Sequence, residues 1–332
     1  MKLREETRAP RISGINAASQ SVEIDYSTHL MNVVTFFEPV SKYSLDSVEE
    51  IRAMSDRYGA LSVGFWYVME PRLSCMLHEG IARRTLERLR LPAETLFDAN
   101  NLIALQGGVQ VVPTVLVVNS NSFLNSRYDG ELSPIEIERN IQGRVALSGY
   151  RDELPSIQKP ERSGGLLRSA SVMRQMGYAG GDFIFGNMVV PETDQEFHLP
   201  DFYLLDTIYP FGAWYVSRDF IEGKSGSTLY ISCGKDEGVY AFAGSDGGAV
   251  VRLHTSIESQ QHLSLGKDVV NNGGMMQIDV EEFRPYEILS NSGDSDVLVS
   301  LQVISGSLAL FSVEFCPEEG VLRGEHAFRS VR

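Results

Sequence analysis

The sequence predicts two domains of different class, an α/β domain followed by an all-β antiparallel sandwich. The chain has 332 residues, a length that commonly corresponds to two domains. Up to about residue 143, short apolar runs alternate with segments of helical periodicity. From about Tyr203 the helical period disappears, and short runs recur every 8–12 residues or so between Gly, Asn and Asp turns.

The first half is expected to begin with a strand, a helix, a second strand and a second helix. Met31–Phe37 is an apolar run rich in β-branched and aromatic residues, which favours a buried strand. Leu45–Tyr58 carries apolar residues at helical spacing, and Gly59 is expected as the left-handed residue that ends the helix. Leu61–Val68 predicts the second buried strand, and Leu77–Arg90 an amphipathic second helix.

A hairpin and a third helix are expected next. Thr114–Asn119 and Phe123–Tyr128 are two strand-like runs separated by a short Ser/Asn turn, which predicts an antiparallel pair. Ser133, Pro134 and Glu136 occupy the N-cap, N1 and N3 positions of a capping box, so we expect a helix to start there.

The second half is predicted to be a sandwich of about eight strands. The expected strands are Ala213–Ser217, Thr228–Cys233, Val239–Ala243, Ala249–His254, Met276–Val280, Tyr286–Ser290, Asp296–Val303 and Leu308–Phe315. Valine and leucine alternate with polar residues within Asp296–Val303, so one face of that strand is expected in the core.

The expected domain organisation follows from these patterns. It comprises an N-terminal arm (1–25), the α/β domain (26–145), a linker and bridging segment (146–200), the β-sandwich (201–317) and a C-terminal tail (318–332). Leu166–Met176 is a candidate for one more helix. The tail is either a frayed terminus or a basic segment that docks a partner or a second copy of the chain.

Composition excludes several classes of partner. The chain has 29 Lys and Arg against 44 Asp and Glu, a net charge of −15, so we expect no nucleic acid partner. No apolar run is long enough for a membrane span, and the first residues lack the apolar core of a signal peptide. We therefore expect a cytoplasmic protein without membrane insertion. Three scattered cysteines and six dispersed histidines predict no disulfide framework, metal site or cofactor.

Three stretches of the first half carry a family resemblance. VVTFFEPVSKYSLDSVEEI, GALSVGFWYV and GVQVVPTVLVVN resemble, in this order, the active-site strand and helix, the next strand, and the cis-proline loop of the TlpA/redoxin branch of thioredoxin-like proteins. The resemblance implies a thioredoxin-like fold for residues 26–145 and a cis peptide bond before Pro113. It also implies that a peptide substrate would pair with the backbone of Val112.

The second half is similar to the carbohydrate-binding-module-like β domain that follows the redoxin domain in DipZ-type cytochrome c biogenesis proteins. The stretches GYAGGDFIFG and LDTIYPFGAWYVS carry this similarity. It implies a jelly-roll or carbohydrate-binding-module-like sandwich.

The resemblance also places two serines where the family carries its C-x-x-C motif. These positions read Ser41-Lys42-Tyr43-Ser44. A hydroxyl forms no accessible alkoxide at neutral pH and no mixed disulfide, so thiol–disulfide exchange is excluded at this loop. Ser41 as a new nucleophile would need a base and an oxyanion hole, and no histidine is expected nearby except His29 across the strand.

Cys75 is the alternative nucleophile. It is expected near a helix N-terminus, where a thiolate is favoured, and His78 would share its helical face. The other interpretation is a half-buried thiol without a resolving cysteine. Cys233 and Cys316 are expected to be packing residues.

The candidate binding residues fall in two groups. Val112 and Pro113, with Lys42 and Tyr43 of the degenerate loop, are candidates for holding a peptide, although the proline alone is equally well explained as a determinant of the fold. In the second half Trp214 and Tyr240 are candidates for a sugar-stacking platform. Large aromatic side chains are, however, more often part of a core.

We therefore predict a non-catalytic, redox-inactive binding or scaffold protein. Its partner is expected to be a protein or peptide, with a carbohydrate or a second copy of the chain as further possibilities. The alternative is a thiol-dependent peroxidase or reductase that uses Cys75.

Overall fold

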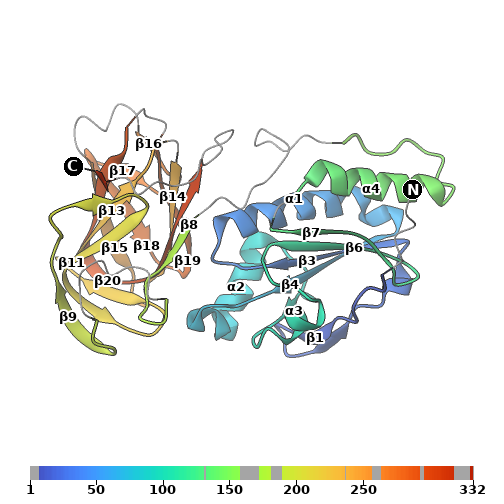
Figure 1. The fold of residues 1–332 in the computed structure, drawn as a ribbon, viewed down its shortest axis with the longest axis horizontal. Helices are drawn as coiled ribbons and strands as arrows, with labels where there is room; N and C mark the ends of the chain where they lie inside the picture. The colour runs from blue at the N-terminus through green and yellow to red at the C-terminus, as the bar shows by residue number, and fades with distance from the viewer. Residues whose placement is uncertain are drawn as a thin grey trace. The chain divides into compact units, whose positions relative to one another are not determined.

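The computed structural model describes residues 7–130, 132–157, 172–180, 189–235, 237–255, 263–291, 295–317 and 330–331. These residues form two compact units, shown in Figure 1. The first unit comprises Met1–Pro39 and Tyr43–Ser169, and the second comprises Ala170–Arg332 together with the short segment Val40–Lys42.

The first unit is built on one mixed sheet. Its strand order is β2-β1-β5-β4-β3-β6-β7. The strands are β1 (Ser13–Asn16), β2 (Ser21–Glu23), β3 (Met31–Phe37), β4 (Val63–Met69), β5 (Leu96–Phe97), β6 (Thr114–Asn119) and β7 (Leu124–Asp129). Strand β4 runs parallel to both β3 and β5, whereas β6 is antiparallel to β3 and to β7.

Helices cover both faces of this sheet. They are α1 (Lys42–Tyr58), α2 (Glu79–Leu89), α3 (Leu102–Gln106) and α4 (Pro134–Leu147), with 3-10 turns at Tyr26–Thr28, Gly59–Leu61 and Ser74–Leu77. In Figure 1, α1 and α4 lie along one side of the strands and α3 along the other. All seven residues of β3 are buried, as a central strand between two helical layers requires. Val34 and Phe36 pack in one cluster with Ile103 of α3.

This arrangement is the thioredoxin-like fold that the resemblance implied. A parallel β3-α1-β4 unit is followed by an antiparallel β6-β7 pair and the helix α4. The peptide bond between Val112 and Pro113 is cis. The predicted cap of the last helix is confirmed, since the Ser133 hydroxyl accepts the Glu136 N–H and Pro134 occupies the first turn.

Several predicted boundaries in the first unit were wrong. Gly59 does not end α1 in a left-handed conformation, because a 3-10 turn continues to Leu61 and Ser62 takes the positive φ of 58°. The strand predicted from Leu61 begins at Val63 for the same reason. The hairpin of β1 and β2 falls within the expected N-terminal arm, and with β5 and α3 it is too short to give a periodic signal.

The second unit is built from antiparallel strands. The strands are β8 (Val172–Gln175), β9 (Thr193–Phe197), β10 (Tyr203–Leu204), β11 (Thr207–Val216), β12 (Ile221–Lys224), β13 (Thr228–Cys233), β14 (Glu237–Gly244), β15 (Ala249–Thr255), β16 (Leu263–Leu265), β17 (Val270–Asn272), β18 (Met275–Val280), β19 (Arg284–Asn291), β20 (Val297–Pro317) and β21 (Ser330–Val331). Strands β10 and β21 pair with each other, and the other strands form two sets joined through β11 and β20. One set includes β13, β15, β17 and β18, and the other β8, β9, β12, β14, β16 and β19.

One long strand replaces two predicted ones. The runs Asp296–Val303 and Leu308–Phe315 are parts of β20, which continues through Gly306. Gly306 has a φ of +76°, and a Cβ there would lie 2.0 Å from the carbonyl oxygen of Gly248. Only glycine fits this bend. Residues 297–302 therefore pair with β13, and residues 307–310 pair with β12 in the other set.

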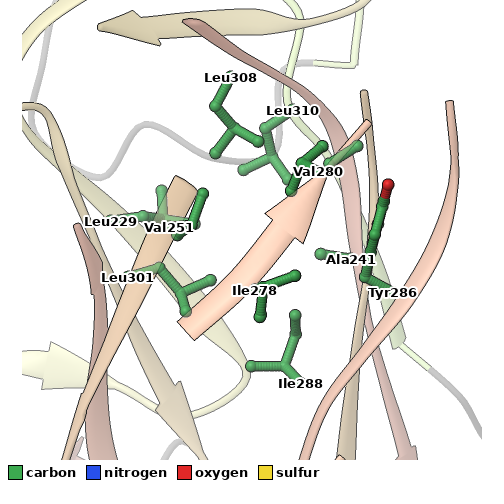
Figure 2. Close-up of a pocket in the computed structure, with 11 residues that line it drawn as sticks. Leu229, Ala241, Val251, Ile278, Val280, Tyr286, Ile288, Leu301, Leu308 and Leu310 are labelled. Atoms are coloured by element: carbon green, nitrogen blue, oxygen red, sulfur yellow. The ribbon is translucent and has the colours of Figure 1, made fainter. Parts of the chain in front are cut away.

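The core of the second unit lies between the two sets of strands. Figure 2 shows apolar side chains from both sets, such as Val251 and Ile288, around a cavity of about 20 Å³. Because the lining side chains present apolar groups, the cavity is a dry packing space rather than a polar ligand site. The predicted all-β antiparallel class of this half is confirmed.

The bridging segment differs from its prediction. Residues 172–175 of the expected helix Leu166–Met176 form strand β8, which pairs with β20; residues 158–171 lie outside the described part of the chain. Of GYAGGDFIFG, residues 181–186 also lie outside it. At the C-terminus, Ser330–Val331 pairs with Tyr203–Leu204, whereas residues 318–329 of the tail are not described.

Candidate functional site

Ser44 lies in the first turn of α1 and bonds back to the residue that follows β3. Its side chain is fully buried, and its hydroxyl oxygen accepts the backbone N–H of Glu38 at 2.8 Å. A buried N–H left without an acceptor would cost about 1–3 kcal/mol. At the position of the family's second cysteine, Ser44 therefore supplies an acceptor that holds the loop.

Ser41 and Lys42 bind the carboxylate of Glu314. The Ser41 hydroxyl donates to Oε1 at 3.1 Å, and the Lys42 N–H donates to Oε2 at 2.5 Å. Glu314 is 2% exposed and lies opposite Tyr240 in the pairing of β14 with β20. The Lys42 ammonium lies 5.4 Å from the centre of the Tyr240 ring. The Glu314 carboxylate thus accepts the Lys42 N–H, a helix-terminal N–H of the kind that stabilises a thiolate in C-x-x-C loops.

Tyr43 is an anchor rather than an exposed binding residue. It is 8% exposed, and its hydroxyl oxygen accepts the N–H of Leu132 at 3.2 Å. Its carbonyl oxygen accepts the Ser47 hydroxyl at 3.0 Å. Lys42 is also 8% exposed. The low exposure of both side chains gives no support to a ligand contact by Lys42 and Tyr43, which stays a prediction.

Cys75 does not lie in the first turn of an α-helix. It is 8% exposed within the 3-10 turn Ser74–Leu77, and α2 begins only at Glu79, after an exposed His78 at the N-cap. The field of a helix terminus falls off within its first turn, so α2 gives this thiol little support as a thiolate. Cys233 is fully buried, as expected of a packing residue, and Cys316 is partly buried in β20.

The loop before Pro113 presents an open segment of backbone. Pro113 is buried, and its carbonyl oxygen accepts the N–H of Gly130 at 2.9 Å. Among the described residues, the backbone N–H and C=O of Val112 make no hydrogen bond. The neighbouring Val111 side chain is 45% exposed. Such a segment is available to pair with an extended chain.

Arg127 of β7 clamps this loop from its other end. Its guanidinium donates to the carbonyl oxygens of Gly107 at 3.1 Å and Gly108 at 2.8 Å, and to the carboxylate of Asp129 at 2.6 Å. Burial alone would raise the pKa of Asp129, but hydrogen bonds from Arg127 and Thr114 outweigh it and hold that pKa below its usual value. The clamp fixes the position of the segment that carries Val112.

Buried carboxyl groups follow the parallel strands of the first unit. Glu38 follows β3, and Glu70 follows β4. The Arg72 guanidinium lies 3.6 Å from the Glu38 carboxylate and 3.8 Å from the Glu70 carboxylate. Asp98 follows β5 and accepts the N–H groups of Ile103 and Ala104 at the start of α3. Glu70 is 3% exposed, and its Oε1 has no hydrogen-bond partner among the residues that the structure describes. Burial raises the pKa of Glu70, Arg72 partly offsets that rise, and Asp98 adds to it.

Glu70→Gln is expected to stabilise the protein at neutral pH. The pKa of Glu70 is higher in the folded protein than in the unfolded chain, so the folded protein keeps this proton to a higher pH. The unmodified protein therefore loses stability as pH rises from the unfolded pKa to the folded pKa. Glutamine resembles the protonated acid and has no such dependence. Urea unfolding at pH 4 and pH 7.5 measures the free energy of unfolding of both proteins. We expect the variant to be more stable relative to the unmodified chain at pH 7.5 than at pH 4. The same difference in stability at both pH values would contradict this prediction.

Trp214 is a core residue, so its predicted role as a sugar platform is wrong. It is 1% exposed, its ring packs on Gly223, and its Nε1–H donates to the carbonyl oxygen of Phe211 at 3.1 Å. Tyr240 is partly buried beneath Lys42 and does not form an open platform. The sequence did not predict that Phe211 and Tyr230 lie next to each other. Their proximity depends on the register of β11 against β13, which the sequence does not show.

Within the described ranges, no group of three or more His, Cys, Asp or Glu side chains is arranged to hold a metal ion. No helix in that same part of the chain has the length and apolar character needed to cross a membrane.

Comparison with known proteins gives structural neighbours only. No family model matches the chain, and no curated protein matches it. A putative thiol:disulfide interchange protein DsbE from Chlorobium tepidum is similar over 43% of this chain and 99% of its own, with 16% identity and a TM-score of 0.38. A putative thioredoxin from Neisseria meningitidis covers 43% of this chain and 93% of its own at 17% identity, with a TM-score of 0.38. A secreted Mycobacterium tuberculosis disulfide oxidoreductase covers 41% and 94% at 15% identity, with a TM-score of 0.32.

Proposed function

We propose that this chain is a redox-inactive thioredoxin-like protein that acts as a binding or scaffold module. The observation that carries the proposal is the pair Ser41 and Ser44 at the turn where the fold places its two active-site cysteines. Without sulfur at these positions no mixed disulfide forms, and no electron pair passes to a substrate disulfide.

The contacts of the two serines support this proposal. Ser44 closes the turn by accepting the Glu38 N–H, and Ser41 donates to the Glu314 carboxylate. Both hydroxyls are therefore engaged in holding the chain.

The proposed binding surface of the first unit is the loop around Val112. Its open backbone suits pairing with an extended peptide, and Arg127 holds the loop in position. We propose a protein or peptide as the partner. For the second unit we propose a carbohydrate-binding-module-like sandwich, in keeping with its two sets of antiparallel strands.

Two activity assays on the full chain test this proposal against the thiol enzyme. We expect no insulin reduction above the dithiothreitol background and no peroxide consumption above the thiol background. Insulin turnover would overturn the proposal. Peroxide consumption that disappears in Cys75→Ser would instead establish the peroxidase, whose thiol is 8% exposed in this structure.

A further inference from the structure

One face of the second unit combines aromatic, amide and cationic side chains. Along β13, Leu229 and Ile231 point into the core, so Tyr230 between them points outward. The same alternation places Arg252 of β15 outward, between the buried Val251 and Leu253. We call this surface the outer face; its residues are Phe211, Thr228, Tyr230, Arg252, His254, Gln277, Ser300 and Gln302.

The strand registers align these residues in two adjacent rows. The first row runs across five strands as Phe211, Thr228, Gln302, Arg252 and Gln277. The second row runs beside it as Tyr230, Ser300 and His254. With neighbouring strands about 4.8 Å apart, the first row extends over about 19 Å. This length accommodates a linear ligand of several units lying across the strands.

Arg252 is a cation on this face with no acidic partner among the residues that the structure describes. Its side chain is partly buried, and among the described residues it makes no hydrogen bond or ion pair. Glutamine flanks it on both neighbouring strands, and the nearest carboxylate along β18, that of Asp279, accepts the Gln277 amide. In a chain of net charge −15, a partly buried arginine that pairs with no acid in the described ranges is suited to bind an anionic group from outside.

The far end of the first row is aromatic. Phe211 is 41% exposed, and its ring meets that of Tyr230 edge to face with centroids 6.3 Å apart. Exposed ring faces stack on the apolar faces of sugars, and amides such as Gln302 pair with hydroxyl groups.

We propose that the outer face binds an oligosaccharide that carries carboxylates, such as an oligouronate. A sugar ring stacks on Phe211, the chain crosses the strands along the first row, and Arg252 pairs with a uronate carboxylate. This inference names the ligand class of the binding role proposed above, but it rests on the second unit alone. If no oligosaccharide binds, the proposal that the first unit is redox-inactive still stands. If the first unit proves redox-active, the proposal for the outer face still stands.

The test compares tetragalacturonate with its methyl ester, in which methyl groups replace the carboxylate charges, by calorimetric titration of the full chain. We expect the acid to bind at least about tenfold more tightly than the ester, with an affinity that falls as salt is added. Arg252→Gln should remove that preference while keeping binding of the ester. Phe211→Ala should weaken both ligands.

Arg218→Gln is the matched control. Arg218 is an arginine of the same unit outside the outer face, and its side chain is 75% exposed, so its removal should leave both affinities unchanged. The proposal is overturned if neither tetragalacturonate nor a mannuronate tetramer binds, if the acid and ester bind equally to the unmodified chain, or if Arg252→Gln keeps the preference for the acid. Equal losses in Arg218→Gln and Arg252→Gln would also overturn it, because they would indicate general charge attraction.

Discussion

Replacing Glu138 with alanine is expected to lower the free energy of unfolding by about 3–5 kcal/mol. Glu138 of α4 is 1% exposed, and its Oε1 accepts the Arg57 guanidinium at 2.9 Å and the Tyr58 hydroxyl at 2.8 Å. Burial, with a contribution from Glu138, raises the pKa of Tyr58 to about 12, so this hydroxyl keeps its proton and donates. Without the carboxylate, the Arg57 charge and the Tyr58 hydroxyl would lose their shared partner between α1 and α4.

Urea unfolding at pH 7 measures this loss, and the exposed pair Arg52–Asp56 supplies a matched control. The two residues of that pair are joined at 3.1 Å on α1, with side chains 28% and 69% exposed. Asp56→Ala should change stability by less than about 1 kcal/mol, because exposed ion pairs contribute little. A loss below about 1 kcal/mol in Glu138→Ala would show that the buried network does not join the two helices as described.

The second large effect concerns sulfur restored to the degenerate loop. In Ser41→Cys/Ser44→Cys, the introduced thiol at position 41 would lie beside the Glu314 carboxylate, which lies within 3.1 Å of the present hydroxyl. A neighbouring negative charge disfavours a thiolate and raises the thiol pKa. Adding Glu314→Gln removes that charge, so we expect the pKa at position 41 to fall by at least about one unit.

Thiol alkylation rates measured against pH give this pKa directly. We expect the triple variant to react faster at pH 7 than the double variant, and to reduce insulin faster. The control adds Glu222→Gln, in place of Glu314→Gln, to Ser41→Cys/Ser44→Cys. Glu222 is a carboxylate elsewhere in the second unit that is hydrogen-bonded to Ser307. The alkylation rate of this control should equal that of the double variant. Equal alkylation rates in the double and triple variants would show that Glu314 does not act on position 41.

The parts of the fold that were predicted correctly depend on local sequence. β3 is buried along its whole length and reads as a continuous apolar run, and the α4 cap requires only Ser133 and its next three residues. The bend of β20 at Gly306 was missed because polar residues around a glycine look the same in a turn and in a bent strand. β1, β2 and β5 owe their pairing to the sheet rather than to any pattern of their own.

The sequence predicted which residues occupy the candidate site but not the hydrogen bonds that they make. The positions of Ser41 and Ser44 follow from the resemblance, but the acceptor role of Ser44 needs the turn geometry. The partner of Ser41 is Glu314, which lies 273 residues away, and no spacing or periodicity connects the two. Trp214 was wrong as a binding candidate because its neighbour Gly223, which makes room for the ring, is identified only by the β11–β12 register.

The most direct test of the central claim is the initial rate of insulin reduction by the unmodified full chain, with dithiothreitol as the electron source. The rate is measured beside the variant that combines Ser41→Cys, Ser44→Cys and Glu314→Gln, which shows that the fold can support the reaction when sulfur is present. We predict that the unmodified chain, with serine at both positions, gives the rate of dithiothreitol alone. A rate that rises in proportion to the concentration of the unmodified chain would contradict the account.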